Sequence, residues 1–561
     1  MERLPIGMDD FRAVRHGYYF VDKSLFIKDI IDHTGMVTLC TRPRRFGKTL
    51  NMSMLYYFFS VDNAQDKDGL FLDLLIQQEH EAYRQHQGNY PTIFLSLKGV
   101  KADSWDDCYK LLRDVVQREY LRHKYLLESP SIGKEDKSFI HRIIDLSAEP
   151  YEYQLSLRNL TEYLFAHYGR RAVVLLDEYD VPVQQGFFYG YYPKAILFLR
   201  VWLTGALKGN SALAFAVLTG VLRIAKESVF SDLNNLWVDS VASSKFSTAF
   251  GFTSAEVQDM ARDFQAEEKL PEIKTWYDGY RFGRQEIYNP WSVLNYFHSG
   301  GQAAPYWLNT SDNQIVRELL EHATDDVQRE LTELMNGTQL ETILDESVSY
   351  PDIYKRKDAL YTMLLMTGYL TVAGTEEIDG MKLYALDIPN REVRQAYRQK
   401  VMDILSEQMD IHDSALLLRS LLQGQAEEFS KRLQDMLSKM MSYYDANGQN
   451  RESFYHGLML GLTSLLGRSY QVRSNRESGF GRFDLAIYPL LPRTNGVLME
   501  FKASDDQKNL DSLAKEALRQ IEDRSYDTEM RAQGVKQIQK YGIAFCGKKC
   551  SIAAHSANEP I

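Results

Sequence analysis

The sequence has 561 residues, which is enough for at least two domains, because domains usually contain about 100–200 residues. Hydrophobic residues make up 44% and charged residues 25% of the chain, the ordinary composition of a globular protein with ample apolar material for its cores. The formal net charge of −11 excludes a surface that attracts polyanions everywhere, so contact with nucleic acid would need a local basic patch or bound metal ions.

Cysteine usage and the apolar segments exclude further classes of protein. The four cysteines are too few and too scattered for a disulfide framework, and Cys546 and Cys550 lack the second half of a zinc site. The N-terminal residues show no apolar segment typical of a signal peptide, and no apolar run is long enough to span a membrane. We therefore expect a cytoplasmic protein with no membrane partner.

Four apolar runs in the first 220 residues are typical of buried strands. They cover residues 36–41, 92–97, 172–176 and 212–219. The stretch Leu50–Phe59 between the first two has the composition of a helix. Continuous apolar strands that alternate with helices predict an α/β fold with a parallel sheet covered on both faces.

The character of the chain changes twice after this region. Residues 255–440 are dominated by helix-like stretches such as Gln314–Met335 and Glu392–Leu422, and a polar, turn-rich segment at 443–450 is typical of a boundary. We expect a P-loop domain over residues 1–255, a mainly helical lid or linker region over 256–445, and a third domain over 446–561.

The last part of the chain predicts a second α/β domain. The expected elements are a helix at Phe454–Leu466, strands at Tyr470–Arg473, Phe483–Leu491 and Gly496–Ala503, a helix at Leu510–Arg524 and a strand at Lys540–Cys546. This is an order of helix, three strands, helix and strand.

A phosphate-binding turn follows the first strand. The P-loop pattern requires Gly, four residues, and then Gly-Lys-Ser/Thr, and Gly47-Lys48-Thr49 matches its second half, whereas Arg42 replaces the first glycine. A turn that leaves a buried strand and opens a helix directs backbone N–H groups at an anion. Lys48 would reach the outer phosphates of ATP and the Thr49 hydroxyl would ligate Mg²⁺.

The other residues of this turn are candidates for nucleotide contact. Arg44, Arg45 and Phe46 belong to the same loop, and Arg42, Arg44 and Arg45 are expected to add positive charge to it. A basic surface turn is the alternative for a Gly-Lys-Thr tripeptide taken alone.

Paired acids at the end of the third apolar run favour the nucleotide site. Val173-Val-Leu-Leu-Asp177-Glu178 has the Walker B form, in which Asp177 would hold Mg²⁺ and Glu178 would polarise the attacking water. Arg223, which follows the next strand, is a candidate sensor of the γ-phosphate, although an ordinary surface arginine is the alternative.

Several stretches of the chain resemble a known family, the AAA-ATPase-like proteins that carry a C-terminal PD-(D/E)XK nuclease-like domain. The stretches that carry the resemblance are Leu4-Pro-Ile-Gly-Met-Asp-Asp-Phe11, Tyr19-Phe-Val-Asp-Lys-Ser24, Arg42-Pro-Arg-Arg-Phe-Gly-Lys-Thr49, Asp177-Glu-Tyr-Asp180, Thr219-Gly-Val-Leu-Arg223, Phe230-Ser-Asp-Leu-Asn-Asn-Leu236, Trp276-Tyr-Asp-Gly-Tyr-Arg-Phe-Gly283 and Tyr288-Asn-Pro-Trp-Ser292. The resemblance implies that an arginine at position 42 is usual for the family and that the domain binds ATP. AAA-type relatives often form rings, so a homo-oligomer is one expectation.

The segment Trp276–Ser292 has two interpretations. It is either an aromatic structural unit that packs against the ATPase region, which we favour, or a lid that contacts nucleotide through Arg281.

Two carboxylates and a lysine in the last domain form a candidate catalytic site. Asp484 opens one predicted strand, and Glu500 and Lys502 lie two positions apart on the next, so their side chains share a face. Converging carboxylates suit Mg²⁺ or Mn²⁺, and a lysine beside the metal can help to activate water against a phosphodiester. This is the Asp…Glu-x-Lys pattern of PD-(D/E)XK nucleases, and an exposed hairpin with ordinary charges is the alternative.

Helper residues around this site are less specific. Glu452 and Gln520 lie on the flanking helices, where the nuclease superfamily has comparable polar residues, but each could equally belong to a helix surface. Glu477 is interpreted as a loop charge and His456 as a helix-face or core histidine.

The leading hypothesis is an ATP-binding and ATP-hydrolysing protein that regulates a C-terminal metal-dependent nuclease, with DNA favoured over RNA as the partner. The alternative is an ATP-dependent conformational switch whose nuclease-like domain binds nucleic acid or protein without cleaving. A third hypothesis is an ATPase that acts on protein partners.

Overall fold

The computed structural model describes most of the chain. The described residues are 3–33, 35–63, 69–223, 235–307, 325–335, 337–346, 348–397, 411–440, 455–456, 458–459, 462–463, 466, 470–478, 481–490, 495–504 and 506–555. The chain divides into two compact units, one made of Met1–Asp312 with Glu341–Val393 and the other of Asn313–Leu340 with Arg394–Ile561.

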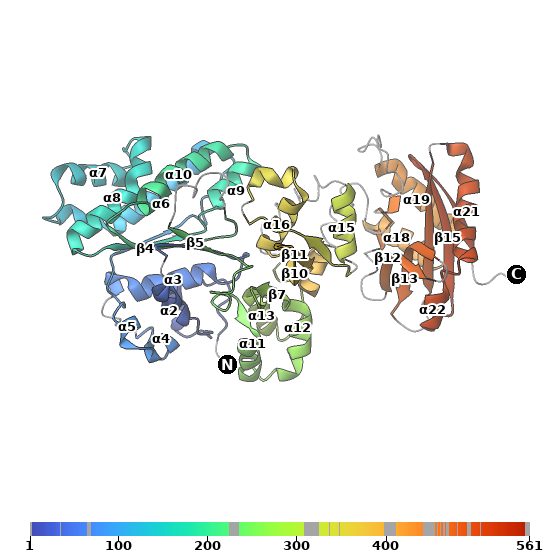
Figure 1. Cartoon of the computed structure of the whole chain (residues 1–561), viewed down its shortest axis with the longest axis horizontal. Coiled ribbons are helices and arrows are strands. Elements are labelled where there is room, and N and C mark those ends of the chain that lie inside the picture. The colour runs from blue at the N-terminus through green and yellow to red at the C-terminus, as the bar shows by residue number, and fades with distance from the viewer. Residues whose placement is uncertain are drawn as a thin grey trace. The chain divides into compact units, whose positions relative to one another are not determined.

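Five parallel strands form the main sheet of the first unit, in the order β2-β3-β4-β1-β5 (Figure 1). Their bounds are β1 Val37–Thr41, β2 Thr92–Ser96, β3 Ala172–Asp177, β4 Leu213–Gly220 and β5 Leu236–Asp239. Every residue of β1 and β3 is buried, as expected for strands with both faces covered. The four predicted strands and the parallel arrangement are confirmed, and β5 is an addition that the sequence did not predict.

Helices cover both faces of this sheet. Helix α3 (Lys48–Phe59) lies on one side, and the longer helices α6, α8 and α10 lie on the other (Figure 1). The remaining bounds are α1 Phe11–Arg15, α2 Leu25–Asp32, α4 Leu75–Gln78, α5 Glu81–Arg84, α6 Trp105–Arg122, α7 Lys134–Ile144, α8 Pro150–Tyr168, α9 Val181–Phe188 and α10 Tyr192–Leu207. Helix α8 has clear sequence signals at both ends: a capping box between Glu149 and Glu152, and the left-handed Gly169 after its last turn.

Two small sheets complete the first unit. The first has the order β6-β8-β7 and is flanked by α11, α12 and α13. The second has the order β10-β11-β9, and α16 lies between β9 and β10 in the chain. Their bounds are β6 Phe252–Thr253, α11 Ser254–Asp263, α12 Leu270–Tyr277, β7 Tyr280–Phe282, β8 Gln285–Tyr288, α13 Pro290–His298, β9 Leu340–Thr342, α16 Lys357–Thr367, β10 Thr371–Ile378 and β11 Met381–Asp387.

The middle of the chain is therefore largely helical, as predicted, but it also contains strands that the sequence analysis missed. Strands β10 and β11 carry Glu376, Glu377 and Lys382, which are common on helix surfaces. Their hairpin depends on a two-residue turn, Asp379-Gly380, in which both residues have positive φ (48° and 79°). Such a turn matches the twist of paired strands and overrides the helical propensity of the flanking residues.

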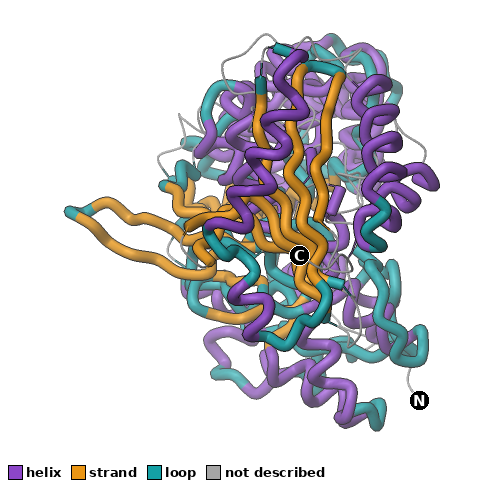
Figure 2. Tube along the Cα trace, turned by 90° about the vertical axis from the view of Figure 1, so that its right-hand side faces the viewer, coloured by secondary structure: helices purple, strands orange, loops and turns teal. Residues whose placement is uncertain are grey.

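The second unit is built on a five-stranded mixed sheet of order β12-β13-β14-β15-β16. Strands β14 and β15 are parallel, the other pairs are antiparallel, and helix α21 connects β14 to β15 and packs on the sheet (Figure 2). The bounds are α15 Asp325–Met335, α18 Ile411–Leu422, α19 Ala426–Met440, β12 Tyr470–Ser478, β13 Gly481–Pro489, β14 Gly496–Ala503, α21 Leu510–Asp523, α22 Thr528–Ala532, β15 Ile538–Cys546 and β16 Lys549–His555.

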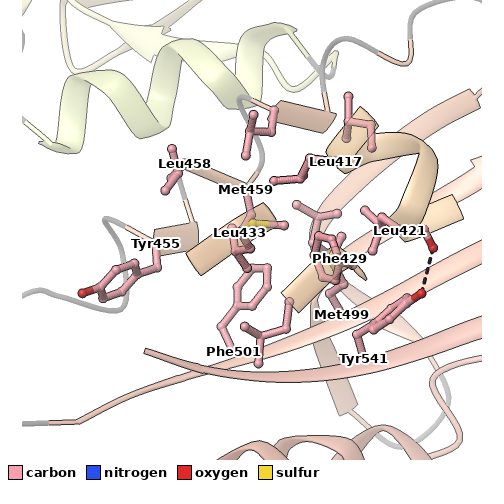
Figure 3. Packing of buried hydrophobic residues seen from close by; sticks show 14 of the residues in the cluster. Leu417, Leu421, Phe429, Leu433, Tyr455, Leu458, Met459, Met499, Phe501 and Tyr541 are labelled. Carbon is pink, nitrogen blue, oxygen red and sulfur yellow. Dashed lines mark hydrogen bonds between the residues drawn. The ribbon is translucent and has the colours of Figure 1, made fainter. Parts of the chain in front are cut away.

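Strand β14 separates two hydrophobic clusters by simple alternation. Met499 and Phe501 pack with leucines of α18 and α19 in the larger cluster (Figure 3). Leu498 packs on the opposite side of the sheet with Ile521 of α21. Because side chains alternate along a strand, Glu500 and Lys502 share the side of Leu498 and face α21. The Tyr541 hydroxyl donates a hydrogen bond to the Leu421 carbonyl at 2.8 Å and ties α18 to the sheet.

The predicted strands and helix of the last domain are confirmed with small changes in their bounds. Strand β12 is longer than predicted, and α22 and β16 were missed. The predicted first helix is described only in part, and the predicted boundary at 443–450 lies outside the described residues. None of the described helices combines the length and the apolar composition needed to cross a membrane.

Candidate functional sites

The P-loop turn joins the buried strand β1 to α3. Helix α3 begins at Lys48, directly after Gly47, whose φ of 84° places it in the left-handed region. The Lys48 ammonium is buried and donates hydrogen bonds to the carbonyls of Arg42 (3.0 Å) and Pro43 (2.9 Å). The first N–H groups of α3 and this lysine therefore converge on the inside of the loop, which is the geometry of a phosphate site.

Arg42 does not add charge to the phosphate site, which corrects an expectation from the sequence. Its guanidinium is fully buried, forms an ion pair with Asp239 on β5 and lies over the rings of Phe250 and Phe282. Because the backbone at Arg42 is not in the left-handed region, this position does not need glycine. The arginine in place of the first P-loop glycine is a structural residue that fixes the end of β1.

The three following residues of the loop have different environments. Arg44 donates to the side-chain carbonyl of Gln184 at 2.8 Å, and the Arg45 guanidinium lies 4.2 Å above the ring of Trp291. Phe46 is fully buried. All three nevertheless line one hollow of about 260 Å³ together with Gly47, Lys48 and Thr49.

Asp177, the first Walker B acid, lies at the centre of a hydrogen-bonded cluster of hydroxyls. It accepts from Thr49 Oγ1 (2.9 Å), Ser96 Oγ (3.2 Å) and Thr219 Oγ1 (2.6 Å). Burial raises the pKa of Asp177, with a further contribution from neighbouring Glu178, and the hydroxyls of Thr219 and Thr49 act in the opposite direction. These hydroxyls come from α3, β2 and β4, so the fold brings four segments to the carboxyl edge of the sheet.

The chemistry of these groups fits Mg²⁺ bound with a nucleotide. The Thr49 hydroxyl and the Asp177 carboxylate are adjacent hard oxygen donors, and they would hold the ion beside the phosphates. A bound ion would supply charge neutralisation for the β- and γ-phosphates. Burial lowers the pKa of Lys48, while Glu178, Asp177 and Asp180 oppose this shift, so its charge in the folded protein depends on the acids around it.

Of Glu178 and Arg223, only Glu178 lines the hollow beside the P-loop. Glu178 lines it and has a φ of 51°, a left-handed conformation that is unusual for a non-glycine residue and is often found at functional sites. Arg223 lines a second, much smaller hollow with Ser240, Glu346 and Thr362. Its role as a sensor of the γ-phosphate stays a prediction.

Asp180, the last residue of the Asp177–Asp180 motif, binds the segment that follows β4. Its buried carboxylate accepts from the backbone N–H groups of Val221 (2.8 Å) and Leu222 (3.0 Å). The Tyr179 hydroxyl donates to the Leu222 carbonyl at 2.6 Å. These two residues of the Asp177–Asp180 motif fix the turn that leads to Arg223.

The aromatic segment Trp276–Ser292 packs against the P-loop. Phe46 packs against Tyr280 and Phe282 of β7 at ring distances of 4.9 and 5.2 Å. Arg281 points elsewhere and donates to the Ala373 carbonyl at 3.3 Å. These contacts fit the structural interpretation rather than a nucleotide contact through Arg281.

The second candidate site lies where β13 and β14 separate. The last pair of residues between them is Leu485 and Met499, which are the direct chain neighbours of Asp484 and Glu500. The Asp484 carboxylate accepts a hydrogen bond from the backbone N–H of Phe501 at 2.7 Å, which holds it beside the Glu500 segment. Burial raises the pKa of Asp484, and the Phe501 N–H, His456 and Lys502 oppose the shift.

Gln520 of α21 connects the other two predicted residues of this site. The Lys502 ammonium donates to Gln520 Oε1 at 3.1 Å, and Gln520 Nε2 donates to Glu500 Oε1 and to the Tyr526 hydroxyl (3.3 Å). Glu500 is only 3% exposed. The structure therefore brings Gln520, which was equally consistent with a helix surface, into direct contact with both Glu500 and Lys502.

The residues present fit a divalent cation held by Asp484 and Glu500. Their carboxylates are hard donors in a buried setting, and charge burial is favourable when a cation compensates it. Among the described residues, no group of three or more His, Cys, Asp and Glu side chains is arranged for a metal. A bound cation would polarise a phosphodiester and lower the pKa of a water molecule.

The other predicted helpers divide into three cases. The His456 ring forms a hydrogen bond with the Asp484 carbonyl at 2.9 Å and packs near Phe501, which fits a buried positioning histidine. Glu452 lies outside the described residues. Glu477 lies in strand β12, opposite Arg482, and not in the loop that was expected. Tyr526 is a member of the hydrogen-bonded group that the sequence analysis missed, because nothing in its local sequence distinguishes it from a core tyrosine.

Two parts of the chain are similar to known families. Residues 5–230 match a family described as "Predicted AAA-ATPase", and residues 450–555 match the PD-(D/E)XK nuclease superfamily. The chain has the layout of an AAA-ATPase-like protein with a C-terminal PD-(D/E)XK nuclease-like domain. It is also 26% identical over 556 residues to an "Uncharacterized protein in vnfD 5'region" of Azotobacter chroococcum mcd 1, which covers 97% of this chain and 96% of that protein.

This layout explains which site residues the sequence could and could not supply. In the AAA-ATPase-like region, the loop and the Walker B acids are contiguous motifs, whereas Ser96 becomes visible only when β2 and β3 are paired. In the nuclease-like domain, Gln520 lies 18 residues beyond Lys502 and reaches it because α21 packs back on the sheet. For Ser96 the sequence signal is a polar residue at the end of a strand, and for Gln520 it is a polar residue on the inner face of a helix.

Proposed function

We propose that the chain binds and hydrolyses ATP with Mg²⁺ at the P-loop and that this regulates a metal-dependent nuclease in its C-terminal domain. Lys48 and Thr49 hold the phosphates and the ion with Asp177, and Glu178 polarises the attacking water. Arg44, Arg45 and Phe46 shape the loop, and Arg223 senses the γ-phosphate. At the second site Asp484 and Glu500 hold Mg²⁺ or Mn²⁺, and Lys502 orients the attacking water.

The observation that carries the nuclease assignment is the chain of contacts from Lys502 through Gln520 to Glu500. A lysine and a carboxylate on the surface of an ordinary hairpin would not be expected to share one partly buried amide of a neighbouring helix. Gln520 orients both side chains and leaves the Lys502 ammonium close to a cation held by Glu500. This arrangement suits the activation of water for phosphodiester cleavage.

Domain boundaries, substrate and cellular location belong to the same proposal. Residues 1–255 form the ATPase domain, 256–445 the connecting lid region and 446–561 the nuclease domain, and the chain acts on DNA in the cytoplasm. The free cysteines of the described part of the chain are compatible with a reducing compartment. A homo-oligomer of the AAA type is part of the same proposal.

The direct test is cleavage of DNA and of RNA by the full-length chain with Mg²⁺ or Mn²⁺, in the presence and absence of ATP. We expect cleavage that requires the metal and changes when ATP is added. Asp484→Ala should abolish cleavage and retain ATP binding, whereas Lys48→Ala should lose ATP binding and the response to ATP. Cleavage that persists in Asp484→Ala would refute the assignment of the site.

A conformational switch without cleavage is the second candidate. The net charge of −11 favours it, because an acidic chain repels the nucleic-acid backbone outside a local site. In that case wild-type protein would bind nucleic acid or a protein in an ATP-dependent way and leave DNA and RNA intact at every metal concentration. The third candidate, an ATPase acting on protein partners, predicts ATP hydrolysis that DNA does not stimulate.

A further inference from the structure

The hollow beside the P-loop extends well beyond the phosphate-binding residues. It has a volume of about 260 Å³, and three stretches far apart in the sequence form its walls in addition to the loop itself. The wall residues come from 5–9 with 19–23, from 249–252 and from 290–294. A triphosphate on Lys48 would therefore occupy only one part of the space.

Charge and apolar surface are unevenly distributed in this hollow. Most of the charged side chains are on the P-loop or follow the neighbouring strands β2 and β3, and Asp9 of the N-terminal stretch forms an ion pair with Lys98. The other walls are largely apolar, with Phe20, Val21, Phe252, Trp291 and Leu294 as the main side chains. An apolar surface next to a phosphate site fits a ligand with a flat uncharged part attached to its phosphates.

The apolar wall is rigid because a hydrophobic cluster supports it from behind. Val21 and Leu294 are only partly buried, and they pack against a cluster that includes Val257, Met260 and Ile273. Each of these side chains thus contacts the core on one side and the hollow on the other. A wall of this kind needs no rearrangement to receive a ligand.

Hydrogen bonds attach the wall segments to the P-loop and α3. Asn51 of α3 donates to the Ala249 carbonyl at 2.7 Å, and the Gly251 N–H donates to the Phe46 carbonyl at 3.1 Å. The one cation in the apolar wall, Lys23, donates to Glu256 (2.7 Å) and to the Thr248 carbonyl (2.8 Å). Glu256 balances the charge of Lys23, and Lys98 balances that of Asp9 in the N-terminal stretch, so the charged groups of this wall are paired.

Trp291 lies at the junction between the phosphate part and the apolar part. The Arg45 guanidinium stacks 4.2 Å from the centre of its ring, and its indole N–H donates to the Tyr306 carbonyl at 3.2 Å. Gly7 approaches the same ring from the N-terminal segment, since a Cβ at that glycine would lie 4.0 Å from Trp291. The ring is thus fixed in orientation and joins the loop, the N-terminal segment and α13.

We propose that the apolar part of this hollow holds the base and ribose of the nucleotide, with Trp291 and Leu294 as residues that determine selectivity for a nucleoside triphosphate over a bare polyphosphate. This inference rests on the proposed function, because it requires that the P-loop holds the phosphates. It adds a second binding element, contributed by the N-terminal segment and α13, to the phosphate-binding loop.

The experiment compares two ligands that share the phosphates and differ in the nucleoside. Affinities of the full-length chain for Mg²⁺–ATP and Mg²⁺–tripolyphosphate are measured by isothermal titration calorimetry. For the wild type we expect ATP to bind at least about tenfold more tightly, since burial of an aromatic base against apolar side chains has this order of effect. Trp291→Ala and Leu294→Ala should each remove most of this difference by weakening ATP while tripolyphosphate stays within about twofold.

Three control variants separate a base contact from general damage. Trp291→Phe keeps a flat ring under Arg45 and should retain most of the preference for ATP. Leu197→Ala, at an exposed leucine of α10 outside the hollow, should leave both affinities unchanged. Lys48→Ala should weaken both ligands together.

The outcomes distinguish the inference from the proposed function. Equal affinity of the wild type for ATP and tripolyphosphate would overturn the inference and leave the phosphate site intact. A similar loss of both ligands in Trp291→Ala and Leu294→Ala would also overturn it, because the residues would then act only by shaping the loop. If the wild type binds neither ligand, the proposed ATP site itself is refuted, and the inference with it.

Discussion

The buried ion pair between Arg42 and Asp239 holds the start of the P-loop to strand β5. Both side chains are fully buried, and the arginine also donates to the carbonyls of Thr41 and Asp239. A pair of this kind is sensitive to loss of one member, because the other charge is then left buried without compensation.

Replacing Arg42 by methionine should therefore destabilise the chain by about 3–5 kcal/mol. The measurement is the free energy of unfolding of the first unit's transition in urea, with Arg42→Met/Asp239→Leu as the double variant that removes both charges. The double variant should recover much of the loss. As a matched control, Arg118→Met removes one member of an exposed pair with Asp114 and should cost at most about 1 kcal/mol. A cost for Arg42→Met as small as that for Arg118→Met would contradict the structural role.

Glu392 is a buried carboxyl that is connected to the P-loop through Trp307. It accepts from Ser292 Oγ and from the Trp307 N–H, each at 2.7 Å, and the Trp307 indole in turn donates to the Arg44 carbonyl at 3.4 Å. Burial raises the pKa of Glu392 from its ordinary value of 4.5 to about 7, and the hydrogen bonds oppose the shift only in part.

This shift predicts a specific dependence of stability on pH. Between pH 4.5 and about 7 the folded chain retains a proton on Glu392 that the unfolded chain has released, so stability falls as pH rises through this window. Over the whole window the loss from this group is about 3 kcal/mol. Unfolding free energies of wild type and Glu392→Gln, measured from pH 5 to about 8, should diverge, with the variant gaining relative stability as pH rises. Parallel curves would show that this carboxyl ionises normally, and the exposed Glu162→Gln serves as the control.

At the scale of single residues, the sequence predicts chemistry where a motif is contiguous and fails where partners are distant. Lys48, Thr49 and Asp177 could be named because strand-end motifs have a fixed geometry. The inward turn of Arg42 could not, because its partner Asp239 lies 197 residues away and only the pairing of β1 with β5 brings them together. Asp484, Glu500 and Lys502 were predicted from spacing, whereas the contact of Gln520 with two of them depends on the packing of α21.

At the scale of elements, the packing of α21 on β15 determines the second site. Gly542 of β15 pairs with Glu500 of β14, and a Cβ at this glycine would lie 2.2 Å from the Ala514 carbonyl and 2.3 Å from the Leu518 nitrogen. The helix backbone therefore rests directly on the strand beside the site (Figure 2). This close approach allows Gln520 to reach Glu500 and Lys502.

Gly542→Ala should push α21 away from the sheet and impair the second site. We expect destabilisation of about 1–3 kcal/mol, as for other overpacked cores, together with a clear loss of metal-dependent cleavage. Gly205→Ala in α10 is the matched control, because a Cβ there would meet nothing within 4 Å and the change should be neutral or stabilising. Thermal unfolding and a cleavage assay on the same samples provide the test, and an unaffected Gly542→Ala would mean that α21 is not closely packed.

The strands also show which elements apolar patterns along the chain can predict. Strands β1 to β4 were predicted because they are continuous apolar runs covered on both faces. The small sheets of the first unit were missed, since β6 has only two residues and β10 lacks a continuous apolar run, with Gly374, Glu376 and Glu377 among its eight residues. In these elements the turn residues and tertiary contacts, rather than hydrophobic periodicity, determine the structure.

At the scale of the whole molecule, the two sites lie in different compact units of one chain. The P-loop, Asp177 and the hollow beside them belong to the first unit, and Asp484, Glu500, Lys502 and Gln520 belong to the second. The proposed regulation therefore requires a coupling free energy between sites that belong to different units of the chain.

Lys48→Ala should therefore separate the two functions. Without this ammonium the loop loses its contact with the outer phosphates, and we expect ATP affinity to fall by at least about tenfold. Metal-dependent cleavage without ATP should persist at the wild-type rate, and the effect of added ATP on cleavage should disappear. A change of the ATP-independent rate would indicate that the variant disturbs the fold rather than the regulation.

The most direct test of the account is metal-dependent cleavage by wild type and by Asp484→Asn, a change that removes a charge and keeps the shape of the side chain. The account predicts that the wild type cleaves DNA with Mn²⁺ or Mg²⁺ and that Asp484→Asn loses at least about 100-fold in rate, equivalent to roughly 3 kcal/mol of transition-state stabilisation. Equal cleavage by both proteins, or none by the wild type, would contradict it.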